Sequence, residues 1–141
     1  MTWCPENMPA SSFLDTTGAL GKVCRTLADR GVNILAFQSF PSEGKGLVHI
    51  VVDNPTTAQT VLDSERLSYT QGEVAQVKLP HRPGELARAA SRLGEAKINI
   101  NYAYCGVEPH TNASLLIFGV AEVGKAVTIL EQTAAAAAAG S

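Results

Sequence analysis

Two short polar loops, each ending in a glycine, hold the residues of this sequence best suited to bind a small charged molecule. One loop comprises Asp15, Thr16, Thr17 and Gly18, and the other comprises His81, Arg82, Pro83 and Gly84. A glycine at the start of a helix lets a ligand approach the backbone, and the N–H groups of a helix N-terminus favour a carboxylate. The loops also offer acceptors for an ammonium group. Together they predict recognition of a free amino acid.

The two loops occupy equivalent places in an internal repeat. A shift of 66 positions superposes residues 18–34, GALGKVCRTLADRGVNI, on residues 84–100, GELARAASRLGEAKINI, without a gap. The superposed pairs include Gly18 with Gly84, Leu20 with Leu86, Asn33 with Asn99, and Ile34 with Ile100. The apolar run 47–52 falls in the same way on 113–118. A gap-free register indicates one unit built twice, and two units are fewer than the three or so that a solenoid needs.

The first unit reads as strand, helix, strand, strand, helix, strand, and the second repeats this order as far as its last helix. In the first, strands are expected at 11–14, 32–40, 47–53 and 67–71, with helices beginning near Gly18 and at Pro55. In the second, strands are expected at 74–79, 98–105 and 113–120, with helices at 84–96 and from 122. The inward stripes of two of these helices are predicted as Ala58, Val61 and Leu62, and as Leu86, Ala89, Ala90 and Leu93.

This order of elements predicts an α+β protein with two ferredoxin-like βαββαβ units, in which antiparallel sheets carry the helices on one face. The expected domains are residues 11–72 and 73–133, preceded by an arm, 1–10, and followed by an alanine-rich tail, 134–141. Alanine favours helix, so the tail predicts an elongated last helix in place of a fourth strand. One edge of the second sheet would then be open or filled by another chain.

Composition excludes several classes of function. A net charge of -2, with 45% hydrophobic and 17% charged residues, provides no basic field for nucleic acid. The three cysteines, Cys4, Cys24 and Cys105, are scattered and lack zinc-ligand spacing, which indicates a reducing compartment. Neither a signal peptide nor an apolar run long enough for a membrane is present in the sequence. We therefore expect a cytoplasmic protein without a membrane partner.

The loop LPHRPGEL, residues 79–86, together with the strand entry INI, residues 98–100, resembles the ACT domain. The family pattern is a strand, then Pro-Gly-x-Leu, a helix, and an x-Asn-Ile strand entry. The second unit matches this pattern closely at Pro83, Gly84, Leu86, Asn99 and Ile100, whereas the first has Thr17 in place of the proline. The resemblance extends over about residues 11–132 and implies a tandem ACT protein, that is, a noncatalytic sensor or regulatory subunit acting on a separate enzyme of amino-acid metabolism.

ACT domains pair side by side and bind a free amino acid at the interface, so the resemblance also implies a site. The loop of each unit would face the second strand of the other, and the chain is expected to form a homodimer. The implied ligand-binding residues are Asp15, Thr16, Thr17, Gly18, Leu20, Asn33, His81, Arg82, Gly84, Leu86, Asn99 and Asn101. No cofactor, metal or catalytic residue is expected.

Other interpretations of these residues remain open. Gly18 and Gly84 are also compatible with helix starts that bind nothing, Asn33 and Asn99 with capping of backbone groups, and Arg82 with a solvated charge. The chain would then be an assembly module, used only for dimerisation or as a regulatory subunit that binds no ligand of its own. An enzyme is a third interpretation, because Cys105 and His110 lie close in sequence as in cysteine hydrolases, but no third member is visible.

Overall fold

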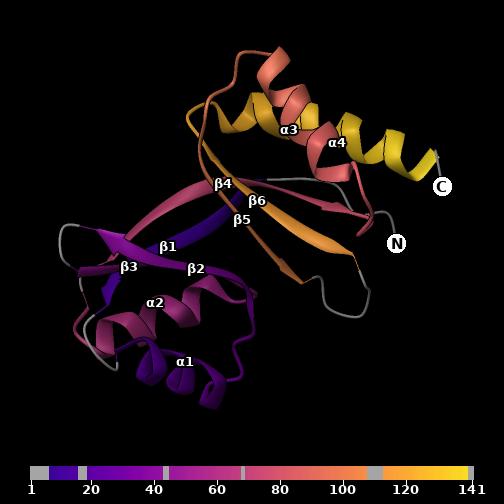
Figure 1. Cartoon of the computed structure of the whole chain (residues 1–141). Helices are drawn as coiled ribbons and strands as arrows, with labels where there is room; N and C mark the ends of the chain where they lie inside the picture. Colours follow the sequence, from indigo (N-terminus) through magenta and orange to yellow (C-terminus); the bar gives the residue numbers. More distant parts are fainter. Residues whose placement is uncertain (1–6, 16–18, 43–44, 68, 108–112, 140–141) are drawn as a thin grey trace. The chain divides into compact units, whose positions relative to one another are not determined.

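The computed structural model describes residues 7–15, 19–42, 45–67, 69–107 and 113–139 (Figure 1). The chain divides into two compact units, one of residues 9–72 and one built mainly of residues 73–141, called here the first and second unit. Both combine antiparallel strands with two helices, which confirms the predicted α+β class and the repeated order of elements.

The first unit is a three-stranded antiparallel sheet with its helices on one face. Its elements are β1 (Asn7–Asp15), α1 (Ala19–Asp29), β2 (Ile34–Ser42), β3 (Lys45–Val52) and α2 (Pro55–Ser64). Strand β3 pairs with β1 and β2, and Ile50 lies opposite both Ser11 and Phe37. Helices α1 and α2 lie side by side (Figure 1). Their buried residues form one core with alternate residues of β3: Val23, Leu27, Val48, Ile50, Val52, Ala58, Val61 and Leu62.

The second unit repeats this plan. Its elements are β4 (Tyr69–Leu79), α3 (Glu85–Glu95), β5 (Ile100–Val107), β6 (Ser114–Val120) and α4 (Val123–Ala139). Strand β6 lies between β4 and β5 and is antiparallel to both. Helix α3 packs against α4 (Figure 1). The core consists mainly of Ala75, Val77, Leu79, Ala89, Leu93, Leu116, Phe118, Ala126 and Leu130.

Two of the predicted helix stripes are confirmed, except at Leu86 and at Ala90, which is only partly buried. Ala58, Val61 and Leu62 of α2 are fully buried, as are Ala89 and Leu93 of α3. Leu86, in contrast, is 56% exposed. It stands in the first turn of α3, where its side chain lines a pocket beside the preceding loop rather than the core.

The boundaries of two strands differ from those expected, whereas the alanine run behaves as expected. Strand β1 begins at Asn7, inside the predicted arm, although its ladder with β3 starts only at Ser11, beyond Pro9, which has no N–H to donate. The predicted strands 67–71 and 74–79 form the single strand β4, Tyr69–Leu79, and Gly72 lies inside it without a positive φ. The alanine run continues α4 to Ala139, as its composition predicted. Among the described residues, no strand follows α4.

Candidate functional site

The loop between β4 and α3 is shaped by two prolines and one glycine. Pro80 follows the last residue of β4, and its carbonyl oxygen accepts a hydrogen bond from the Arg82 N–H at 3.0 Å. Gly84 then adopts a left-handed conformation, with φ of 93°, immediately before the first residue of α3. A side chain would strain the backbone there, which explains why the helix starts with glycine.

The N-terminus of α3 is open, whereas that of α2 is capped. In α2, the Asn54 Oδ1 accepts a hydrogen bond from the Thr57 N–H at 3.1 Å, and Pro55 needs no partner at the first helical position. In α3, no side chain caps the helix. The Glu85 N–H donates to the Arg82 carbonyl at 3.5 Å, so the N–H groups of Leu86 and Ala87 are the ones left to water or to a ligand, and the helix dipole adds a preference for an anion.

A pocket with a volume of about 340 Å³ adjoins this helix end. Its lining brings together four residues predicted from the sequence: His81, Arg82, Gly84 and Leu86. The others that line it are Leu79, Pro80, Pro83, Glu85, Cys105, Ser114 and Leu116. Most of these side chains are apolar, and the pocket lies within the second unit. A more open hollow of about 560 Å³, lined by Lys78, Leu79, Pro80, His81 and Ala113, adjoins it.

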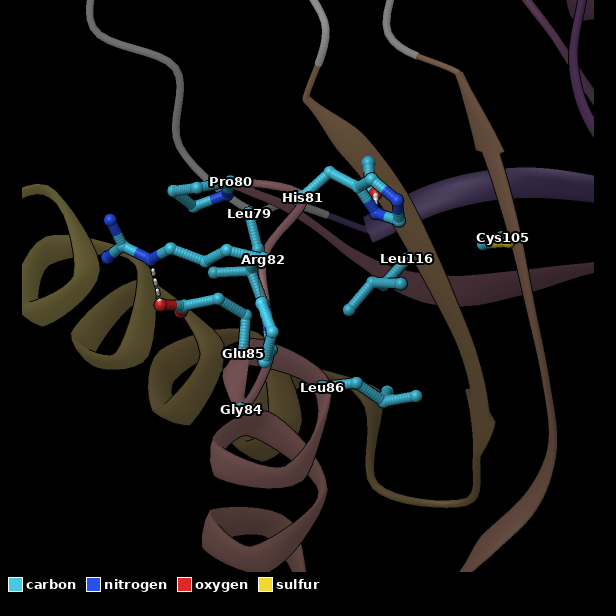
Figure 2. A pocket seen from close by; sticks show the side chains of 11 residues that line it. Leu79, Pro80, His81, Arg82, Gly84, Glu85, Leu86, Cys105 and Leu116 are labelled. Atoms are coloured by element: carbon cyan, nitrogen blue, oxygen red, sulfur yellow. Dashed lines mark hydrogen bonds and ion pairs between the residues drawn. The ribbon is translucent and has the colours of Figure 1, made fainter.

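The polar wall of the pocket comes from the loop and from β6. The Nδ1 atom of His81 lies 3.2 Å from the Ser114 Oγ, at hydrogen-bonding distance. Cys105, an exposed thiol on β5, lies opposite Leu116 in the strand register. Figure 2 shows His81, Leu116 and Leu86 on one side of the loop. Ser114 and Leu116 were not predicted as site residues, because only strand pairing brings β6 beneath the loop.

Arg82 is directed away from these residues, toward α4 (Figure 2). Its Nε donates to the Glu85 Oε1 at 2.7 Å, and its Nη2 donates to the Ala137 carbonyl oxygen at 3.3 Å. Arg88 Nη1 lies 3.6 Å from the same Glu85 oxygen. Glu85 was missed from the sequence, although its spacing of three residues from Arg82 across a helix start is a signal for such a pair.

The predicted asparagines make local contacts. The Asn99 side chain donates to the Asn101 Oδ1 at 2.9 Å. The Asn33 N–H donates to the Asp53 Oδ1 at 2.9 Å, and its carbonyl accepts from the Asp53 N–H at 3.1 Å. The two Asn33–Asp53 hydrogen bonds connect the start of β2 to the end of β3. The expected contact of these asparagines with the glycine loops of the opposite unit stays a prediction.

Of the predicted polar loop at 15–18, only Asp15 lies among the described residues. Asp15 is the last residue of β1, and Thr16, Thr17 and Gly18 lie outside the described residues, as does His110. Leu20 is half-buried against the core of the first unit. Within the described segments, no three His, Cys, Asp or Glu side chains gather as a metal site would require. No helix there is long and apolar enough to cross a membrane.

Comparison with known proteins supports the resemblance. Residues 14–67 match the sequence model of the ACT domain. The matched segment covers most of the first unit, from the end of β1 to the residue after the turn that follows α2. The second unit repeats the same order of strands and helices. A search of the curated proteins finds no match.

Solved structures share the fold along nearly the whole chain. A protein from Bacteroides thetaiotaomicron superposes with a TM-score of 0.78 at 20% identity, covering 91% of this chain and 89% of that one. The ligand-free regulatory subunit of aspartate kinase from Thermus thermophilus gives 0.61 at 16% identity, covering 92% and 95%. The corresponding subunit from Thermus flavus gives 0.57 at 16% identity, with the same coverage. These likenesses establish the ferredoxin-like fold.

Proposed function

We propose that this chain is a noncatalytic regulatory protein that binds a free amino acid in the pocket beside the 80–84 loop. The observation that carries the proposal is the uncapped N-terminus of α3, which opens beside a largely apolar pocket of about 340 Å³. The ACT domain at residues 14–67 and the likeness to structures named as regulatory subunits of aspartate kinase support a regulatory role. The regulated partner would be a separate enzyme of amino-acid metabolism.

The site suggests how the ligand lies. Its carboxylate accepts hydrogen bonds from the first turn of α3, where the helix dipole favours negative charge. Its ammonium group is directed to the Ser114 hydroxyl, which accepts hydrogen bonds. Its side chain lies among Leu79, Leu86 and Leu116.

The charges around the pocket indicate the class of amino acid. Arg82 and Glu85 line the pocket but neutralise each other at 2.7 Å. A ligand with a charged side chain would therefore find no counter-ion among these two, and burying an unpaired charge is costly. We propose an amino acid with an uncharged side chain.

Isothermal titration calorimetry of the purified chain against the twenty standard amino acids tests the proposal. We expect saturable heat from at least one amino acid with an uncharged side chain. Complete absence of heat and of a thermal shift across the panel would exclude the sensor function and favour an assembly module.

A matched pair of variants at Leu86 places the site. Because this side chain is 56% exposed, its replacement disturbs the fold little. Leu86→Glu puts a negative charge among the apolar side chains that would hold the ligand's side chain and close to the helix end that would bind its carboxylate, and we expect it to abolish binding. Leu86→Gln has nearly the same size without the charge and should retain binding within about tenfold, the equivalent of about 1.4 kcal/mol. Equal affinities in the two variants would place the ligand elsewhere.

A further inference from the structure

The guanidinium of Arg82 is shared between acceptors on two different helices. Nε donates to the carboxylate of Glu85 in the first turn of α3, and Nη2 donates to the carbonyl of Ala137 near the end of α4. The last four carbonyls of a helix have no partner within the helix, and a cation there also complements the helix dipole. One side chain thus connects the pocket loop to the last turn of α4.

This sharing leaves the carboxylate of Glu85 incompletely bonded. The side chain is only 5% exposed, and its Oε2 has no hydrogen-bond partner among the residues that the structure describes. An arginine usually meets a carboxylate through two parallel hydrogen bonds, and a buried oxygen without a donor is unfavourable. The Nη2 group carries two N–H donors, but where it donates to Ala137 it does not reach Oε2.

Two arrangements of Arg82 therefore compete. In the one seen in the structure, the Ala137 carbonyl is bonded and the Glu85 Oε2 is not. In the other, the guanidinium bonds both oxygens of Glu85 and releases Ala137. Bonding Oε2 requires the guanidinium to turn, because Nη2 does not reach this oxygen while it lies 3.3 Å from the Ala137 carbonyl, so the two arrangements differ in the position of the guanidinium relative to α4.

We propose that Arg82 is a positioning switch through which an occupied pocket loosens the last turn of α4. A ligand carboxylate at the N-terminus of α3 adds negative charge beside Glu85, and this favours the arrangement in which the guanidinium pairs with both oxygens of that residue. The inference rests on the proposed amino-acid binding, and it adds a structural response to that binding. Arg82 contacts Glu85 and Ala137 in this scheme and does not have to touch the ligand.

Hydrogen exchange of the full chain, followed by mass spectrometry, tests the switch. The probe is the amino acid that gives the largest heat in the calorimetric panel, used at saturation. We expect the backbone amides of residues 134–139 to exchange faster by on the order of tenfold when it binds, because a hydrogen bond to a charged group is lost.

Variants of the second unit separate the switch from general loosening. Arg82→Gln should raise exchange at 134–139 without any amino acid and should remove the further response to it. Arg92→Gln, the same change on an exposed residue of α3, should behave as wild type. Glu85→Gln keeps an oxygen acceptor without the charge, and it should bind the amino acid while α4 no longer responds. If Arg82→Gln folds poorly, Glu85→Gln still tests the switch.

The outcomes distinguish the two proposals. Binding that leaves exchange at 134–139 unchanged in the wild type would overturn the switch and leave the proposed function intact. So would a full response in Glu85→Gln. If no amino acid in the panel binds, the proposed function fails and the coupling fails with it, even if Arg82→Gln alone loosens α4.

Discussion

The two units share a backbone plan but differ in the charges placed on it. Applying the same shift of 66 positions, Arg82, Glu85 and Ala137 correspond to Thr16, Ala19 and Gln71. The first unit therefore has no counterpart of the ion pair at the helix start. Its equivalent helix, α1, is instead tied to the end of α2 by Lys22, whose Nζ lies 3.1 Å from the Glu65 Oε2.

The hydrophobic positions, in contrast, are nearly superposable. Leu27 and Leu93 correspond by the shift, and both are fully buried. Gly31 and Lys97 also correspond, and both have positive φ, 71° and 60°, at the end of a helix. The comparison indicates that the two units are alike in their core residues and in the conformation of their helix ends. They differ in the charges of their loops and in the final helix. The predictions below test that division.

The largest expected effect is in the shared core. Leu27→Ala and Leu93→Ala each remove a buried side chain from an equivalent place, and each should lower the free energy of unfolding by about 2–5 kcal/mol. Urea unfolding followed by circular dichroism measures the loss. Leu86→Ala, exposed on the same helix as Leu93, serves as the control and should change stability by less than about 1 kcal/mol. A large loss at only one of the two buried positions would show that the cores are not equivalent.

The next effect belongs to the loop of the second unit. Gly84→Ala places a Cβ at φ of 93°, where nothing lies within 4 Å, so that the cost is backbone strain rather than a clash. We expect a loss of about 1–2 kcal/mol in chemical unfolding. Gly94→Ala, inside α3 with equal space around it, should instead gain about 0.5–1 kcal/mol because alanine favours helix. Equal effects in the two variants would contradict a conformational role for Gly84.

A smaller effect separates the two helix ends. Lys97→Gly gives the second unit the residue that the first unit uses at Gly31. Because glycine adopts positive φ without steric cost, this change should raise the free energy of unfolding by about 0.5–1 kcal/mol. Gly31→Lys is the reverse exchange and should lower it by a similar amount. Thermal melts of both variants measure these changes. Melting temperatures that shift in the same direction in the two variants would contradict the equivalence of the two helix ends.

The smallest effect is a pH dependence specific to the first unit. His49 stacks on Phe40, with ring centroids 5.6 Å apart, and burial lowers the pKa of its imidazole below the ordinary 6.5. The unfolded chain therefore takes up this proton first. The stabilising contribution is complete above pH 6.5 and is lost as the pH falls from there through the lower pKa of the folded state.

The second unit supplies a control for this titration, because the position equivalent to His49 is Leu115. Between pH 8 and pH 5, the stability of His49→Leu, measured by urea unfolding, should fall less steeply than that of the wild type. Parallel curves for the two proteins would argue against a contribution from His49.

The repeat alone predicted much of this architecture. The helical spacing of the apolar residues predicted the burial of Ala58, Val61 and Leu62, and of Ala89 and Leu93. The structure confirms it. The same is true of the helical alanine run, because intrinsic propensity is a local property. His81, Arg82, Gly84 and Leu86 were also predicted as site residues, and they line one pocket.

Tertiary structure decided what those residues do. Strand pairing brought Ser114 and Leu116 to the pocket, although they are more than 25 positions from the loop in the sequence. Packing of α3 on α4 placed the Ala137 carbonyl within reach of Arg82, whose Nη2 donates to it at 3.3 Å. Local sequence specifies the conformation of each segment, because backbone preferences act over a few residues. Which charges meet depends on long-range packing, and only the folded chain determines it.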